Sequence, residues 1–180
     1  MAIYTKTGDR GETGLYDPTR KKNIRISKSS AKINAIGSID EVNNYLGVCV
    51  SLCKDKKTKS FLENIQSNLF LIGSILAGAK NEINILETKI LEKEIDKMEG
   101  NLPPLGNFIL PGGGKFAAHL HFARSLVRKA ERDIVFLDSK EKVNFDILSF
   151  INRLSDFLFM LAREVNFKEK YREKVWKVIK

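Results

Sequence analysis

The sequence predicts an all-α bundle, and three observations support that fold class. After residue 37, apolar residues recur at spacings of three and four, which is typical of helices that pack on one face. Glycine and proline are concentrated in short segments between these repeats. No run of residues is convincing as a strand. We therefore expect four long helices and one lesser helix, preceded by an ordered N-terminal loop.

The first helix is expected to begin at Ser38, because Ser38-Ile39-Asp40-Glu41 has the form of a capping box. Its apolar stripe continues to Cys53. Thr58 begins the second helix, which is expected to end near Gly78. The segment from Thr5 to Asp17 has no sustained period and is rich in glycine, so we expect it to form a loop or a short extended piece.

The second half of the chain contributes three further helices. The third is expected over about 84–98, with Asn84 and Glu87 at its start and with Gly100 and Pro103-Pro104 after its end. The fourth is expected over about 115–135 and the fifth over about 144–165. The tail, 168–180, is expected to form a short, basic, amphipathic helix.

The chain has 180 residues and a formal net charge of +9, which indicates one basic domain over 1–180 with a loop region (1–37) and a helical bundle (38–180). Cys49 and Cys53 fit neither a disulfide scaffold nor a zinc site, and we expect them to be small core residues. No segment has the length of a signal sequence or a membrane span, so a cytoplasmic protein is expected. The charge is compatible with nucleic acid, an acidic membrane surface or a polyphosphate as partner, and composition does not choose among them.

Two motifs carry little weight by themselves. The run Gly112-Gly113-Gly114-Lys115 lacks the first glycine and the hydroxyl of a phosphate-binding P-loop, so a tight turn is favoured over an anion site. His119 and His121 are two residues apart and would point to different sides of a helix. Neither follows a glutamate by three residues, which argues against a ferritin-like di-metal bundle.

An arginine stripe on the fourth helix is more informative. Arg124, Arg128, Glu131 and Arg132 fall on one face in a protein otherwise rich in lysine. A charged helix face is ordinarily exposed to solvent, but arginine is also the residue that binds phosphate or carboxylate bidentately, through two parallel hydrogen bonds. Polar residues also interrupt the apolar fifth helix, namely Asn152, Arg153 and Asp156, and we expect them to pair with the stripe. Asp40 is a further candidate partner for one of these arginines, although an aspartate in the first turn of a helix equally serves to favour the helix dipole.

Six segments of the chain, taken together, are more informative about its relatives than any one segment alone. They span about residues 3–166 and are Tyr4–Thr13, Arg25–Lys28, Gly37–Asn43, Phe108–Gly113, Ala123–Arg132 and Asn152–Asp156. In this order they closely resemble the signature blocks of the PduO-type ATP:cob(I)alamin adenosyltransferases. Six matching blocks in the same order make a chance resemblance improbable.

The resemblance implies a five-helix bundle that assembles as a homotrimer with its active sites at the subunit interfaces. It also implies transfer of the 5′-deoxyadenosyl group of ATP to the cobalt of a corrinoid, cob(I)alamin, with release of triphosphate and formation of adenosylcobalamin. By position, the ATP-binding residues would be Thr5, Lys6, Thr7, Gly8, Thr13, Gly14 and Lys28 of the N-terminal region, with Arg128, Lys129, Ala130, Glu131, Arg132 and Asn152 across the interface.

The remaining implied roles concern the corrinoid and the interface. Phe108 would lie beneath the corrin ring in place of the lower axial base, and Asp40 would pair with Arg124 between subunits, so that Arg128, Phe108, Asp40 and Arg124 form the catalytic set. Cobalt(I) is already a strong nucleophile, so no general base or covalent side chain is required. Mg²⁺ is expected on the ATP phosphates, with no protein ligand assigned to it.

The chain departs from the family pattern in two blocks, where Lys129 and Val42 replace a common arginine and leucine, and in the longer, basic stretch 16–23. The expected partners are a corrinoid reductase or an adenosylcobalamin-dependent enzyme, with neither nucleic acid nor membrane. The competing hypothesis is a helical bundle without enzymatic activity that binds nucleic acid or another polyanion through its charge, with an affinity that falls steeply with salt.

Overall fold

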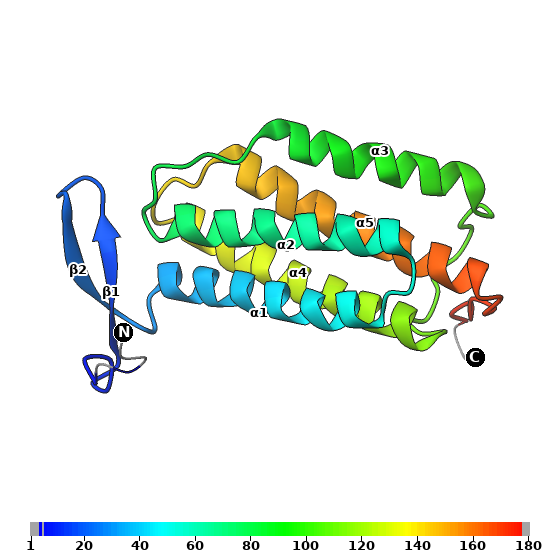
Figure 1. Cartoon of the computed structure of the whole chain (residues 1–180), viewed down its shortest axis with the longest axis horizontal. Coiled ribbons are helices and arrows are strands. Elements are labelled where there is room, and N and C mark those ends of the chain that lie inside the picture. Colours follow the sequence, from blue (N-terminus) through cyan, green and yellow to red (C-terminus); the bar gives the residue numbers. More distant parts are fainter. Residues whose placement is uncertain (1–3, 5, 178–180) are drawn as a thin grey trace.

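The computed structural model describes residue 4 and residues 6–177, which form an elongated helical bundle with a β-hairpin at one end (Figure 1). Its helices are α1 (Ala31–Leu52), α2 (Lys56–Leu76), α3 (Ile85–Asn101), α4 (Lys115–Asp138) and α5 (Phe145–Lys168). Helix α4 packs against both α1 and α5, while α2 covers α1 and α3 covers α5. The expected fold class, an all-α bundle of five helices, is confirmed within the described residues.

Apolar stripes on the helices meet in one core. Val42 and Leu46 of α1, Val127 of α4 and Leu154 and Leu158 of α5 are completely buried. Burying each such leucine or valine contributes about 1.5–3 kcal/mol relative to leaving it in water, so these stripes fix which faces of α1, α4 and α5 meet. Cys49 is also buried in this core, as expected. Within the part of the chain described, no helix is long and apolar enough to cross a membrane.

Helix α1 begins at Ala31, so the expected start at Ser38 is wrong. Ser30 is the N-cap, and its side chain accepts a hydrogen bond from the backbone N–H of Ile33. Ser38 lies inside the helix, is 3% exposed, and donates its hydroxyl to Asp133 of α4. The capping-box pattern therefore occurs in mid-helix, where a long-range contact satisfies the serine.

The other helices begin close to their expected positions, and side chains cap α2, α3 and α5 locally, whereas Gly114 begins α4 without a side-chain cap. Asp55 accepts from the Thr58 N–H at 2.7 Å at the start of α2, and Asn84 accepts from the Leu86 N–H at 2.9 Å at the start of α3. Glu87, expected to share the cap of α3, instead accepts a hydrogen bond from Asn68 of α2 at 2.8 Å. This contact ties α3 to α2 across the surface of the bundle.

The N-terminal region contains a β-hairpin that the sequence analysis did not predict. Strand β1 (Glu12–Asp17) pairs antiparallel with β2 (Lys22–Ser27), with Glu12 opposite Ser27. The hairpin packs against the end of α2 at Gly78, which has a φ of +104°. A Cβ added at Gly78 would lie 2.2 Å from the carbonyl oxygen of Tyr16, so only glycine permits this approach.

The expected C-terminal helix is also wrong for the described residues 169–177. Lys170 takes a left-handed φ of +61°, and the chain then continues without helix. Val175 forms an isolated antiparallel bridge with Ile109, which lies in the connection between α3 and α4. The tail and this connection lie at the end of the bundle opposite the hairpin (Figure 1).

Candidate active site

Lys28 gathers the N-terminal loop into a compact turn. Its side-chain Nζ donates to the carbonyl oxygen of Gly8 at 2.9 Å, and its backbone N–H donates to the carbonyl oxygen of Gly11 at 2.8 Å. A Cβ on Gly8 would lie 3.2 Å from that Nζ, so glycine at this position allows the lysine to approach closely. Gly8 and Lys28, both predicted as site residues, are thus brought together by the fold.

Arg25, to which the sequence analysis gave no role, holds the same loop from the second strand. Its guanidinium donates to the backbone carbonyl oxygens of Thr7 and Glu12, and it also faces the Glu12 carboxylate at 3.5 Å. Lys6, which precedes Thr7 in this loop, has a left-handed φ of +58° and is exposed. Thr5, another predicted site residue, lies outside the described residues.

A groove of about 540 Å³ lies between the hairpin, α1 and α2. Thr13 and Lys28 line it from the hairpin side, and Asp40 lines it from α1. Gly14, between Thr13 and Leu15 on β1, is exposed. The predicted N-terminal site residues are therefore grouped at one end of the bundle, around this groove.

The predicted arginine stripe lies along α4 on the side that meets α5. Arg124 is half-buried, and its guanidinium carbon lies 5.5 Å from the centre of the Phe159 ring. Burial lowers the pKa of Arg124, and the positive charge of Arg128 lowers it further. Arg128 and Arg132 are exposed, and the Arg132 guanidinium donates to the Arg128 carbonyl oxygen at 2.8 Å. Two guanidinium groups thus remain accessible for an anionic ligand.

The polar residues of α5 pair with the stripe only in part. Asn152 donates its side-chain amide to the Glu131 carboxylate of α4 at 2.7 Å, so this expected pairing is confirmed. Asp156 instead accepts from Arg153 of its own helix at 2.7 Å. Arg153 also reaches Glu92 of α3 at 3.2 Å, so the expected pairing of Arg153 with the stripe is wrong. The negative charge of Asp156 still acts on the stripe, since it partly offsets the lowering of the Arg124 pKa by burial.

A cavity of about 700 Å³ opens between α3, α4, α5 and the α3–α4 connection. Arg124 and Arg128 line it from α4, and Phe108 lines it from the connection with its side chain 81% exposed. His121 lies in its wall, and burial lowers the pKa of this imidazole, which keeps it neutral near pH 7. The cavity therefore combines an exposed aromatic ring with both arginines and carboxylates, the latter being Glu92, Asp96, Glu99 and Asp156, a mixed surface suited to a large ligand that is partly apolar.

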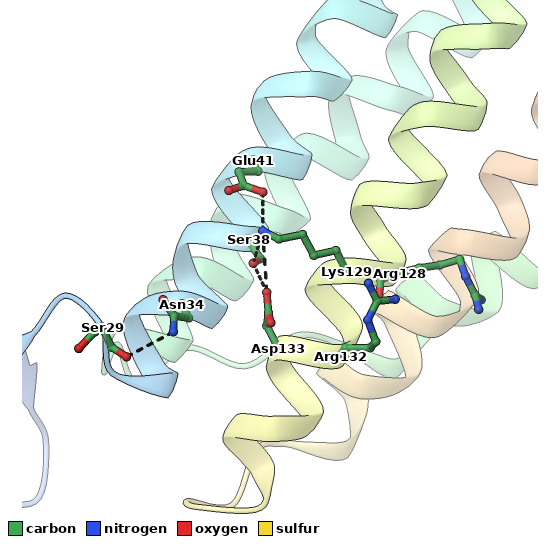
Figure 2. A network of polar contacts seen from close by, with 8 residues as sticks. All are labelled: Ser29, Asn34, Ser38, Glu41, Arg128, Lys129, Arg132 and Asp133. Carbon is green, nitrogen blue, oxygen red and sulfur yellow. Dashed lines mark hydrogen bonds and ion pairs between the residues drawn. The ribbon is translucent and has the colours of Figure 1, made fainter.

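A cluster of polar contacts joins α1 to α4 beside the α4 arginines (Figure 2). Lys129 donates to Glu41 of α1 at 2.8 Å and to Ser38 at 3.2 Å, while Ser38 bonds to Asp133. Figure 2 shows Lys129 reaching toward α1 while Arg128 extends to the other side of α4. Lys129, predicted at the nucleotide site, is thus occupied in joining α1 to α4. Ala130, predicted there too, is completely buried in the core.

The predicted pair of Asp40 and Arg124 does not form within one chain among the described residues. Ser38 of α1 faces α4, and Asp40 follows it by two residues, which places it roughly 200° further around the helix. Asp40 lines the groove beside α2, whereas Arg124 lines the cavity beside α5. One chain therefore presents two separate halves of the predicted site.

Comparison with known proteins identifies the family of the chain. The model of the cobalamin adenosyltransferase family matches residues 3–165. The chain belongs to this family. It is 42% identical over 170 residues to the corrinoid adenosyltransferase PduO of Citrobacter freundii, covering 91% of this chain and 49% of that protein. The chain thus spans about half the length of that relative and of its Salmonella typhimurium counterpart.

Relatives of similar length exist within the cobalamin adenosyltransferase family. The corrinoid adenosyltransferase of Bacillus subtilis is 37% identical over 174 residues, which cover 92% of this chain and 87% of that protein. A solved structure of a PduO-type ATP:corrinoid adenosyltransferase from Lactobacillus reuteri, a phenylalanine-to-histidine variant complexed with cobalamin and ATP, matches with a TM-score of 0.90. Its identity is 36%, and the match covers 98% of this chain and 97% of that chain.

Sequence reasoning missed two polar residues near the end of α5 in this member of the cobalamin adenosyltransferase family. Arg163 and Asn166 are only 4% and 3% exposed, and both contact the connection that carries Phe108. A signal was present, because both interrupt an otherwise apolar stretch of helix, as Asn152 does. The triple-glycine run lies against Asn166, which accepts the Gly114 N–H and donates to the Gly112 carbonyl oxygen.

Proposed function

We propose that this chain transfers the 5′-deoxyadenosyl group of ATP to the cobalt of cob(I)alamin, forming adenosylcobalamin and releasing triphosphate. The observation that carries the proposal is the match, over nearly the whole chain, to a relative solved with cobalamin and ATP. The cavity beside Phe108 supports it, because its size and mixed lining suit a large ring with a partly apolar surface.

The chemistry requires positioning and charge more than a reactive side chain. The cobalt(I) electron pair attacks C5′ of ATP, the cobalt–carbon bond forms, and the C5′–oxygen bond breaks with its electrons leaving on triphosphate. The protein must therefore hold C5′ in line with the cobalt and stabilise the negative charge that develops on the leaving group. Arg128 and Arg132, both exposed on α4, and Lys28 on the N-terminal loop supply positive charge for this task.

We assign the nucleotide to a site made by two subunits of a homotrimer. Lys6, Thr7, Gly8, Thr13, Gly14 and Lys28 come from one subunit, and Arg128, Glu131, Arg132 and Asn152 come from its neighbour. The separation of these two sets on one chain supports the assignment, since Thr13 and Lys28 of the first set line the groove, whereas Arg128 of the second set lines the cavity. Asp40 and Arg124 then pair across the interface, where the two halves meet.

Phe108 is assigned to the lower face of the corrin ring. Its side chain is 81% exposed at the cavity, so it is available to contact a ligand. An apolar ring in that place offers no atom that coordinates cobalt and occupies the space that the lower axial base would need. The resulting four-coordinate cobalt(II) is easier to reduce to the cobalt(I) nucleophile.

Mg²⁺ is expected with the nucleotide. Within the described residues, no group of three or more histidine, cysteine, aspartate or glutamate side chains could hold a metal ion. The N-terminal loop offers lysines, hydroxyls and glycines, a set that suits phosphate oxygens, and we assign the ligands of Mg²⁺ to the triphosphate and water. When bound, the ion would neutralise part of the charge on the leaving triphosphate.

The proposal is tested by mixing the purified protein with ATP and chemically reduced cob(I)alamin in the absence of oxygen. We expect an ATP-dependent change in the corrinoid spectrum and one equivalent of triphosphate for each light-sensitive cobalt–carbon bond. Phosphorus NMR distinguishes triphosphate from separate diphosphate and phosphate. A spectrum that stays unchanged by ATP, with a folded protein, contradicts the proposal.

A further inference from the structure

The connection between α3 and α4 is held in place by the C-terminal segment. The Leu110 N–H donates to the Lys174 carbonyl oxygen at 2.8 Å, and the Trp176 N–H donates to the Phe108 carbonyl oxygen at 2.8 Å. These bonds enclose the bridge between Ile109 and Val175. The backbone from the Phe108 carbonyl to the Leu110 amide is thus fixed to a segment from the far end of the chain.

Arg163 of α5 joins this segment to the start of the connection. Its Nε donates to Glu173 at 2.8 Å, and its Nη2 donates to the carbonyl oxygen of Pro103 at 2.9 Å and to the second Glu173 oxygen at 3.3 Å. The Arg163 side chain is only 5% exposed. A buried guanidinium requires charged or hydrogen-bonded partners, so Glu173 and Pro103 are held firmly around it.

Asn166, one helical turn further along α5, holds the other end of the connection. Its side-chain amide donates to the Gly112 carbonyl oxygen at 2.9 Å, and its side-chain oxygen accepts the Gly114 N–H at 3.0 Å. Its backbone carbonyl oxygen also accepts the Tyr171 N–H at 2.8 Å, at the point where the C-terminal segment begins. The last turns of α5 therefore form hydrogen bonds to both ends of the α3–α4 connection and to the C-terminal segment that pairs with the middle of this connection.

We propose that Arg163, Glu173 and Asn166 form a clamp that positions Phe108 at the cavity. The Phe108 ring is 81% exposed, so core packing does not fix its place. Its position depends on the backbone, and the clamp determines where that backbone lies. The consequence for corrinoid chemistry rests on the proposed function: a Phe108 that shifts within the cavity no longer excludes the lower axial base.

Hydrogen exchange of the full-length protein tests the clamp without any ligand. Glu173→Ala removes both oxygens that Arg163 contacts, whereas Glu173→Gln keeps one acceptor. Arg172→Ala, in the neighbouring and exposed position, is the matched control. In Glu173→Ala we expect the Leu110 and Trp176 amides to exchange roughly ten to a hundred times faster, because the loss of a hydrogen bond to a charged group permits local opening. Glu173→Gln should fall between Glu173→Ala and wild type, and Arg172→Ala should match wild type.

Turnover with two corrinoids separates positioning from a general structural role. One substrate is cobalamin, and the other is a corrinoid whose lower nucleotide loop has been removed. With a one-electron chemical reductant supplied in excess to convert cobalt(II) to cobalt(I), we expect Glu173→Ala to lower the rate of adenosylation from cobalt(II) cobalamin by about tenfold. The rate from the base-free cobalt(II) corrinoid should fall by less than about twofold. Electron paramagnetic resonance of bound cobalt(II) cobalamin should show splitting by the base nitrogen in a larger fraction of the Glu173→Ala sample than of wild type.

Each outcome decides the question. Faster amide exchange, together with a loss of adenosylation rate that occurs only when the lower base is present, supports the clamp. An equal loss of rate with both corrinoids would mean that Glu173 only stabilises the fold, which overturns the positioning role. Unchanged exchange at Leu110 and Trp176 overturns the clamp itself. If Glu173→Ala does not fold, Glu173→Gln is subjected to the same comparison. If wild type adenosylates neither corrinoid, the proposed function fails, and the exchange measurement still decides whether the clamp exists.

Discussion

Mixed assemblies of two inactive variants test whether the active site is shared between subunits. Lys28 lines the groove beside α2, and Arg128 lines the cavity beside α5, so Lys28→Ala and Arg128→Ala damage different halves of the site. Each substitution alone should lower the rate roughly 10²–10³-fold, since each removes a charge that stabilises the leaving group. In a mixed assembly of the proposed homotrimer, an intact groove on one subunit can face an intact cavity on the next.

The expected recovery follows from counting interfaces. When the two variants are mixed in equal amounts and assemble at random, the required groove is intact at half of the interfaces and the required cavity at half, so about one site in four is fully intact. The mixture should therefore regain about a quarter of the wild-type rate.

The measurement is the adenosylation rate after co-expression of the two variants, with their ratio determined by mass spectrometry. Arg128→Ala mixed with Arg132→Ala is the control, because both damage the same half and no interface becomes intact. A mixture of Lys28→Ala and Arg128→Ala that remains as inactive as its parents would refute the shared site and place both halves of the reaction within one chain.

Three further predictions concern individual residues. Phe108→Ala should lower turnover of cobalamin much more than it weakens ATP binding measured by calorimetry, and equal loss of both would reduce Phe108 to a packing residue. Gly113→Ala should lower the free energy of unfolding in urea by about 3 kcal/mol, because Gly113 has a φ of +109° and its Cβ would lie 2.0 Å from the Asn166 side-chain oxygen. Gly112→Ala, with open space around it, should change that energy by less than about 1 kcal/mol. Cys53 should react with a thiol reagent in the native protein at pH 8. Cys49, whose pKa burial raises to about 12, should react only after unfolding. Reaction of both cysteines at the same rate in the native protein would contradict this prediction.

The helices were predictable from the sequence because two local signals agree. Apolar stripes such as Leu62–Leu76 fix the face that is buried, and a capping residue such as Asn84 or Asn144 fixes the start. The start of α1 was predicted wrongly because Ser38 and Glu41 match a capping pattern inside a longer helix. Their partners, Asp133 and Lys129, lie on α4, and a contact between distant segments leaves no local signal.

The hairpin and the tail were missed for different reasons. Leu15, Ile24 and Ile26 alternate with exposed residues, but the alternation is short and the surrounding stretch is rich in lysine and arginine. In the tail, an amphipathic spacing suggested a helix. The backbone of Val175 pairs instead with Ile109, a partner that the local sequence does not reveal.

The site residues were predictable individually, but their grouping was not. The family blocks named Lys28, Asp40, Arg124 and Arg128, and only the fold shows that the first two line one hollow and the last two another. Arg163 could have been noticed as a charge within an apolar helix. Its role remained hidden because its partners, Glu173 and Pro103, belong to segments without regular secondary structure.

The most direct test of adenosyl transfer follows the transferred carbon itself. The protein is incubated with cob(I)alamin and ATP labelled with ¹³C at C5′, and the corrinoid is then isolated in the dark. Adenosyl transfer predicts a ¹³C resonance from carbon bonded to cobalt, one triphosphate released per label transferred, and loss of that resonance on exposure to light. Label that remains entirely in ATP, or that appears in adenosine with no bond to cobalt, would contradict it.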